Sequence, residues 1–166
     1  MGILRQLDCA RLLGIVMPYR YVIDKERRLV VSTGWDCVTF AEAKSHQDQL
    51  LRDPDFSPEF NQIVDARTVT ALDLSIDEIR TIVNRRIFSP TSKRAFVADR
   101  PFVYGMGRMM TTYLEMSKAV SESLMFHDLP SALKWLGLHE LPDTIKPESV
   151  RKGNANRPSA QDDKSA

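Results

Sequence analysis

The chain has 166 residues, of which 43% are hydrophobic and 27% charged, and its formal net charge at pH 7 is +1. This length supports one hydrophobic core rather than two. So small a net charge gives no bulk electrostatic attraction to nucleic acid or to an anionic membrane. No apolar run reaches the roughly 18 residues of a membrane-spanning helix. We therefore expect neither a nucleic-acid partner nor a transmembrane segment.

Residues 1–17 form a leader, MGILRQLDCARLLGIVM. Arg5, Asp8 and Arg11 interrupt its apolar residues, so it lacks the hydrophobic stretch of a secretory signal. A short amphipathic helix is one prediction for this leader. The alternative is that translation starts at Met17 and that the gene start has been placed too early.

The periodicities that follow predict nine elements in the order ββαβαβαβα. The predicted elements are strands 19–24 and 29–38, helix 40–53, strand 61–66, helix 76–87, strand 93–98, a helix from Pro101, strand 123–127 and helix 131–138. A hairpin followed by alternating helices and strands predicts a single α/β domain, with a mixed, mostly parallel sheet covered by helices. We place this domain at 18–138 and expect 139–166, which lacks aromatic residues, to be a disordered tail.

Two of the predicted helices begin with N-cap signals. Thr39 is followed three residues later by Glu42, which is the spacing of a capping box. Ser75 precedes Asp77 and Glu78, two acidic residues suited to the first turn of a helix.

The segment PFVYGMGRMM contains a Gly-x-Gly that suggests a phosphate-binding turn. A dinucleotide fingerprint needs its first glycine directly after the strand and its third where Met110 stands. Gly105 instead comes seven residues after Ala98. We therefore expect Gly105 and Gly107 inside the helix, where they allow close helix–sheet packing or leave room for something small.

The same helix contains a group of adaptable side chains. Methionine fills irregular gaps in a core, and core filling is the simpler interpretation of this group. The alternative is an apolar pocket lined by Tyr104, Gly105, Met106, Met109 and Met110.

Polar residues at strand ends form a second group of candidates. Asp65 ends a central strand, where open α/β sheets place ligands. It could form one rim with Arg67, Asp73, Asp99, Arg100, His127 and Asp128. The alternative is that these residues are loop caps and solvated pairs.

The histidine, the basic cluster and the cysteines do not indicate a catalytic, metal-binding or nucleic-acid-binding site. His46 lies beside the apolar face of its helix and is expected to be packed and hydrogen-bonded. The basic cluster is interpreted as a solvated face, and it consists of Arg85, Arg86, Lys93 and Arg94. Cys9 and Cys37 lack metal-ligand spacing and are expected to be reduced thiols in a cytoplasmic protein. We expect no catalytic residue, no metal and no cofactor.

Residues 19–138 resemble a STAS domain, the fold of bacterial anti-sigma-factor antagonists. The resemblance rests on the order of the segments LVVSTGWDCVTFAEAKSHQDQLL, QIVDARTVTALDLSIDEI, AFVADRPFVYGMGRM and SLMFHDLPSALKWL. The run DPDFSPEFNQIVDAR is also similar to little-characterised bacterial STAS-like proteins.

The resemblance implies a regulatory, non-enzymatic module that binds another protein. In the antagonists a kinase phosphorylates the serine that follows the turn aspartate. Asp73 matches that aspartate, but Leu74 stands at the phosphoacceptor position, so this serine is absent and Ser75 follows it. We expect partner contacts from residues 66–76, made by Arg67, Asp73, Ser75 and Asp65, with Arg67 as the main anchor. The alternative function is a carrier or sensor of an apolar small molecule or lipid, by analogy with lipid-carrying folds of similar architecture.

Overall fold

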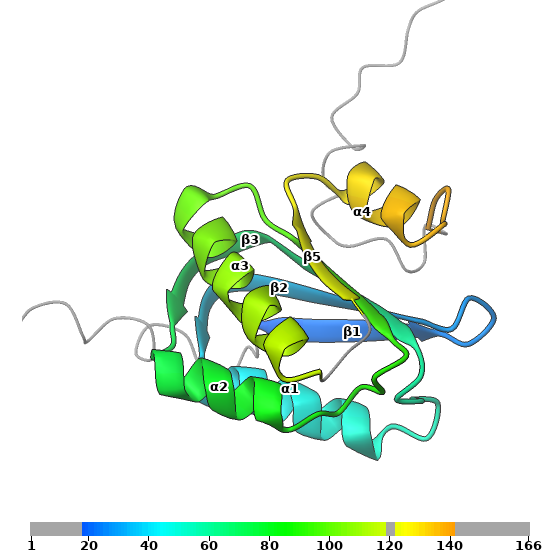
Figure 1. Cartoon of the computed structure of the whole chain (residues 1–166), viewed down its shortest axis with the longest axis horizontal. Helices are drawn as coiled ribbons and strands as arrows, with labels where there is room; N and C mark the ends of the chain where they lie inside the picture. The colour runs from blue at the N-terminus through cyan, green and yellow to red at the C-terminus, as the bar shows by residue number, and fades with distance from the viewer. Residues whose placement is uncertain (1–17, 119–121, 142–166) are drawn as a thin grey trace, which may run out of the picture.

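The structure, a computed structural model, describes residues 18–118 and 122–141. Its elements are β1 (Tyr19–Asp24), β2 (Leu29–Thr39), α1 (Phe40–Arg52), β3 (Asn61–Asp73), α2 (Ile76–Asn84), β4 (Lys93–Val97), α3 (Pro101–Met116), β5 (Glu122–Phe126) and α4 (Leu129–Trp135). The predicted order ββαβαβαβα is confirmed (Figure 1). The leader 1–17 and the tail from residue 142 lie outside the described residues.

The five strands form one sheet in the order β1-β2-β3-β4-β5. β1 pairs antiparallel with β2, and every other pair is parallel. Parallel crossovers share one hand, and each here advances to the next strand in the same direction. Consequently α1, α2 and α3 cover one face of the sheet, while α4 covers the other (Figure 1).

Strand alternation gives each face its own core. On the α1–α3 face, Val30, Val64 and Phe96 pack with buried residues of the three helices. On the α4 face, Val31 and Ile63 pack with buried residues of α4 and with neighbouring strands. Because both faces of the central strands are covered, apolar residues occur on both sides of these strands.

The predicted N-caps are present. The Glu42 carboxylate accepts hydrogen bonds from the Thr39 backbone N–H at 2.8 Å and from its hydroxyl at 2.9 Å. At the start of α2, the Glu78 N–H donates to Ser75 Oγ at 3.3 Å. Asp128 caps α4 by accepting from the Ser131 N–H at 2.8 Å.

β3 is longer than the sequence pattern predicted. The expected strand ended at Ala66, but pairing with β2 continues to Asp73, which lies opposite Thr39. Val69 is fully buried within this extension, although register shifts interrupt the ladder on either side of Trp35. The expected partner-binding loop over 66–76 is therefore mostly strand, because β2, with 11 residues, provides an edge on which it pairs.

The two glycines of Gly-x-Gly lie inside α3, as the spacing predicted. A Cβ added at Gly107 would lie 2.5 Å from the Met125 sulfur, so this glycine lets α3 approach β5. A Cβ at Gly105 would have no neighbour within 4 Å. Close packing therefore explains Gly107 and leaves Gly105 without a steric role.

Two further details differ from expectation. Leu141, which the sequence placed in the tail, is 2% exposed and packs with the α4 cluster. Cys37 is disulfide-bonded, so the expectation of a reduced thiol is wrong for this residue, and Cys9 lies outside the described residues.

In the part of the chain that the structure describes, no helix is long and apolar enough to cross a membrane. Cytoplasmic location stays a prediction, without the support that reduced thiols gave it.

Candidate functional site

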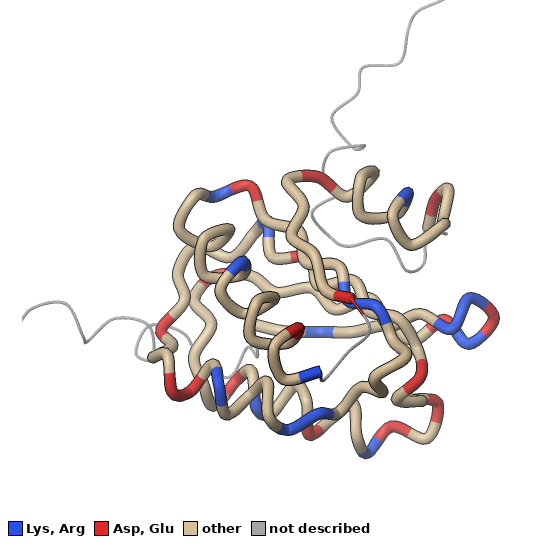
Figure 2. Tube along the Cα trace, in the orientation of Figure 1, with Lys and Arg blue, Asp and Glu red and all other residues tan. Residues whose placement is uncertain are grey.

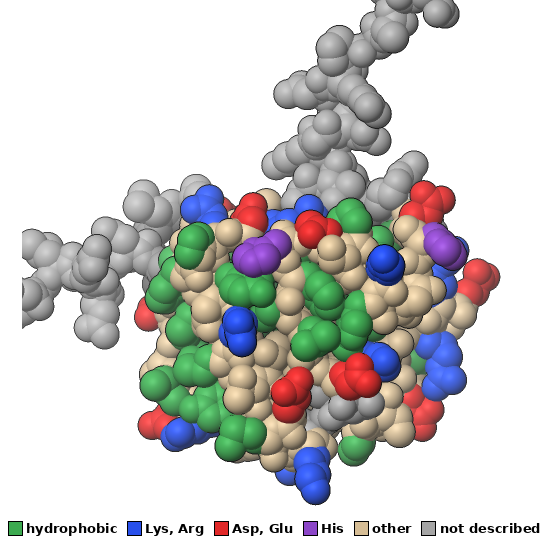
Figure 3. All heavy atoms as spheres, turned by 45° about the horizontal axis from the view of Figure 1, so that its top comes forward, with side chains coloured by type: hydrophobic (Ala, Val, Ile, Leu, Met, Phe, Trp, Pro, Cys, Tyr) green, Lys and Arg blue, Asp and Glu red, His purple; other side chains and the backbone are tan. Residues whose placement is uncertain are grey.

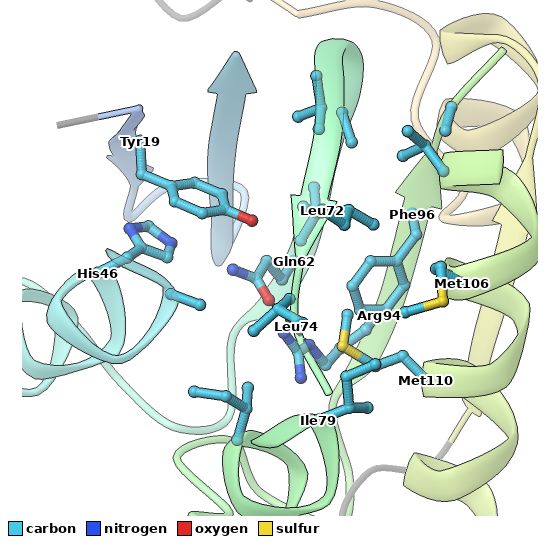
Figure 4. Close-up of a pocket in the computed structure, with 18 of the residues that line it drawn as sticks. Tyr19, His46, Gln62, Leu72, Leu74, Ile79, Arg94, Phe96, Met106 and Met110 are labelled. Atoms are coloured by element: carbon cyan, nitrogen blue, oxygen red, sulfur yellow. Dashed lines mark hydrogen bonds between the residues drawn. The ribbon is translucent and has the colours of Figure 1, made fainter. Parts of the chain in front are cut away.

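A cavity of about 90 Å³ lies between the α1–α3 face of the sheet and its helices (Figure 4). Most of its wall is aliphatic, aromatic or thioether, contributed by all three helices and by β3 and β4. The apolar lining includes Leu50, Val64, Leu72, Leu74, Ile79, Ile82, Phe96, Val103, Met106, Met110 and Met125. Lining of this kind suits the apolar part of a small ligand.

Polar side chains enter the same cavity. Tyr19, Gln62 and Arg94 come from β1, β3 and β4, and His46 comes from α1 (Figure 4). On β3 and β4, Gln62 and Arg94 share a face with Val64 and Phe96, two residues further along each strand. The sheet therefore places a polar patch at one end of an otherwise apolar cavity.

Arg94, Gln62 and His46 belong to one hydrogen-bonded chain that runs through Ser32. Arg94 Nε donates to Gln62 Oε1 at 2.8 Å, and Gln62 Nε2 donates to Ser32 Oγ at 2.9 Å. His46 Nε2 lies 3.0 Å from the same Ser32 oxygen. Among the described contacts, His46 Nε2 is the acceptor within reach of the Ser32 hydroxyl proton. We therefore assign the ring proton of His46 to Nδ1.

Burial keeps His46 neutral. It lowers the pKa of His46 to about 4, and the nearby Arg94 charge acts in the same direction. The ring stacks on Tyr19 with centroids 4.8 Å apart. Burial likewise raises the pKa of Tyr19 to about 12, partly opposed by Arg94. The expectation of a packed, hydrogen-bonded histidine is confirmed.

The prediction that the basic cluster is a solvated face is wrong for Arg94. Its guanidinium lies deep in the fold, and the side chain lines both this cavity and a smaller pocket of about 10 Å³, which Gln47 and Arg86 also line. It lies over the rings of Phe88 and Phe96, 4.9 and 5.1 Å from their centroids. Within the described residues it forms no ion pair with a carboxylate. Burial lowers the pKa of Arg94 to about 10, which leaves it a cation at pH 7.

Two other members of that cluster form ion pairs with carboxylates. Arg85 pairs with Asp48, and Lys93 pairs with Glu122. Periodicity could not separate Arg94 from these neighbours, because both faces of β4 are covered and alternation does not mark either as solvent-facing.

Of the five residues predicted to line an apolar pocket, Met106 and Met110 do so. They are four residues apart and share one face of α3. The prediction is wrong for Tyr104, Gly105 and Met109, which lie at other angles around the helix. Tyr104 stacks on His127 at 4.0 Å, and Gly105 is exposed.

The predicted rim is partly assembled on the other face of the sheet. Asp65 is buried, and its carboxylate accepts two hydrogen bonds from the Arg67 guanidinium, at 2.9 Å from Nε and 2.8 Å from Nη2. This pairing raises the pKa of Arg67, and Asp99 and Asp128 contribute to a lesser extent. The prediction of Arg67 as an exposed anchor is wrong, because its side chain, 22% exposed, neutralises a buried carboxylate.

Asp73 and Ser75 remain exposed at the start of α2. The Ser75 backbone N–H and hydroxyl each donate to the Glu78 carboxylate at 2.8 Å, and these bonds hold the pKa of Glu78 below its usual value. Leu74, at the position that matches the phosphoacceptor of the antagonists, lines the cavity. The exposed residues expected to bind a partner, Asp73 and Ser75, are therefore the immediate neighbours of a residue that lines the cavity.

Charges elsewhere do not gather by sign. Figure 2 shows basic and acidic residues alternating along the chain trace, including the tip of the β1–β2 hairpin. On the face shown in Figure 3, acidic and basic side chains stand singly among apolar patches. Among the described residues, no three His, Cys, Asp or Glu side chains form a group that could hold a metal ion.

Neither a protein-family model nor a curated protein matches this chain. The chain does match solved structures, among them an uncharacterised protein of the DUF3478 family with a SpoIIAA-like fold, from Shewanella loihica PV-4. The TM-score is 0.52 and the identity 14%, and the match covers 75% of this chain and 98% of the other. At this identity the likeness is one of fold. The described residues therefore have a SpoIIAA-like fold, with a single mixed sheet and four helices.

Proposed function

We propose that this protein is a non-enzymatic, STAS-like regulatory module that binds a small molecule with an apolar body. The observation that carries the proposal is the cavity of about 90 Å³ between the sheet and three helices. Well-packed cores contain few voids larger than a water molecule. A cavity of this size, with mostly apolar walls, is therefore a candidate binding site rather than ordinary packing.

The cavity wall can adjust to its occupant. Met106, Met110 and Met125 line it from α3 and β5. Methionine side chains change shape at little energetic cost, so the cavity can enlarge around a ligand. For comparison, an apolar cavity of about 150 Å³ is large enough to bind benzene. We therefore expect small ligands, or the end of a longer one.

The direct test is to add volume to the cavity. Ala66 lines it from β3, whereas Ala71 lies on the same strand, is also half-buried and does not line it. Ala66→Leu should abolish binding of 1-butanol in an NMR titration of the full chain, and Ala71→Leu should leave it unchanged. Native mass spectrometry of the purified protein should also detect a co-purifying small molecule. Absence of both a bound molecule and any titration shift at cavity residues would reject the proposal.

A second candidate function is protein binding at the start of α2. Ile76 is 50% exposed there, beside the exposed Asp73 and Ser75. Exposed apolar residues rimmed by polar ones are common in interaction sites. This surface coincides with the one that the STAS resemblance implies, without Arg67 and Asp65, which pair with each other.

Ser75 variants separate a structural role from a switch in this second candidate. As a cap, Ser75→Ala should lower the free energy of unfolding by about 1 kcal/mol and leave partner recovery in a pull-down unchanged. Ser75→Asp keeps the cap, so a loss of the same partner in this variant would identify a phosphorylation switch. Ile76→Ser should reduce recovery in either case. Unchanged recovery with Ile76→Ser would reject this surface.

A further inference from the structure

We propose that the cavity ligand carries a carboxylate group, and that Arg94 binds it. This inference rests on the proposed small-molecule site and names the ligand class: short aliphatic monocarboxylic acids. The observation behind it is a cation that lines the cavity and has no carboxylate partner among the described residues.

The charge of the site comes first. A buried charge is unfavourable unless it is paired, and buried arginines are normally matched by carboxylates. The hydrogen-bond partner of Arg94 is the neutral amide of Gln62, and its ring contacts are with Phe88 and Phe96. These neutral groups leave the positive charge unbalanced. An anion in the cavity would balance it.

The orientation of the guanidinium comes second. Gln62 accepts from Nε and is itself held by Ser32, so the plane of the guanidinium is fixed by the network. No hydrogen bond within the described residues uses the two Nη groups. These form the end of the fork that binds the two oxygens of a carboxylate side by side. Gln62 is thus a positioning residue and Arg94 the binding residue.

The number of cations decides between classes of anion. Arg94 is the one arginine or lysine among the residues that line the described cavity. His46 is the other basic side chain in this wall, and its pKa of about 4 leaves it neutral at pH 7. One positive charge matches a monocarboxylate better than a phosphate dianion. The apolar wall next to the polar patch then accommodates the aliphatic chain.

The experiment compares ligands that share one chain and differ in head group. NMR titrations of the full-length protein at pH 7 would use butanoate, 1-butanol, butylamine and inorganic phosphate. We expect butanoate to bind at least about tenfold more tightly than 1-butanol, the effect of one charge-assisted hydrogen-bonded contact. Butylamine and phosphate should not shift cavity resonances. This comparison needs no variant, so it does not depend on how a substitution affects folding.

Variants then assign the effect to Arg94. Arg94→Met should reduce butanoate affinity by about tenfold or more and leave 1-butanol affinity nearly unchanged. Arg94→Lys keeps the charge without the planar fork and should give an intermediate loss. The control is Arg108→Met, an exposed arginine on α3, which should behave as wild type.

Each outcome separates this inference from the proposed function. Equal affinity of the wild type for butanoate and 1-butanol would overturn the carboxylate assignment and leave the apolar site standing. Binding of phosphate but not of butanoate would also overturn it. If butanoate binds tightly to wild type and equally to Arg94→Met, the arginine is not its anchor. If no probe binds, the carboxylate assignment is rejected, and the apolar site is rejected with it when native mass spectrometry also detects no co-purifying molecule.

Discussion

Arg67 and Arg94 lie on opposite faces of the same sheet and in opposite electrostatic situations. Arg67 donates two hydrogen bonds to the buried carboxylate of Asp65, close to the start of α4. Arg94 extends from β4 toward the helices α1–α3, donates to an amide and has no carboxylate partner within the described residues. One arginine completes a charge pair inside the protein, and the other leaves its positive charge facing a cavity.

The contrast separates a structural arginine from a binding one. A paired buried charge contributes to the fold, because removal of either partner leaves the other uncompensated. An unpaired one contributes little to the fold and becomes favourable when an anion binds. Sites of the second kind commonly reduce stability in return for function. The two arginines should therefore differ in their contribution to the free energy of unfolding.

The largest effect is expected at the paired arginine. Arg67→Ala leaves the buried Asp65 carboxylate without this partner, so the free energy of unfolding should fall by about 3 kcal/mol or more. Urea denaturation monitored by circular dichroism measures it. Arg108→Ala, an exposed control, should cost less than about 0.5 kcal/mol. A loss at Arg67 no larger than that of the control would mean that the pair contributes nothing to folding.

Acid should destabilise the folded protein through His46, which belongs to the same hydrogen-bonded chain as Arg94. The pKa of His46 is about 4 in the folded protein and 6.5 in a model peptide, so between these values the unfolded chain binds a proton that the folded protein does not. The free energy of unfolding should therefore fall as the pH drops from 6.5 to 4, by up to about 3 kcal/mol, with no contribution above that window.

His46→Gln supplies the comparison, because glutamine can also hydrogen-bond to Ser32 but does not titrate. Carboxylates with a lowered pKa also make the folded protein less stable in acid. The informative quantity is therefore the difference between the pH profiles of unfolding free energy of the wild type and of His46→Gln. Parallel profiles between pH 4 and 6.5 would show that His46 is not held neutral.

The smallest effect is expected at the unpaired arginine. Arg94→Met removes a buried charge, which favours folding, and one hydrogen bond to Gln62, which opposes it. The two contributions nearly cancel, and the ligand-free protein should stay within about 1 kcal/mol of wild type in the same urea experiment. A loss as large as that of Arg67→Ala would make both arginines structural and end the contrast.

Sequence periodicity predicted the fold well because its signals are local. Strand alternation, capping boxes at Thr39 and Ser75, and the position of Gly105 and Gly107 each depend on neighbouring residues. The extension of β3 to Asp73 was missed, although Thr68, Val69 and Thr70 have high strand propensity. Pairing with the 11-residue β2 decides that extension, and the pattern of β3 alone does not contain it.

The site was predicted less well because it depends on contacts between distant elements. Met106 and Met110 were found through helix spacing, but Gln62 and Arg94 were not. An arginine in a basic run is usually solvated, and only the strand order reveals that β4 is covered on both faces.

The two glycines of α3 should affect the rate at which a ligand enters and leaves the cavity. Each makes the helix about 1 kcal/mol less favourable than alanine would, and Gly105 has no packing partner that compensates. The helix that carries Met106 and Met110 is therefore the wall of the cavity that should open most readily. We expect a ligand to enter and leave as α3 opens, on the microsecond to millisecond timescale of such motions. Gly105→Ala should then lengthen the residence time of butanoate while leaving its contacts with Arg94 unchanged.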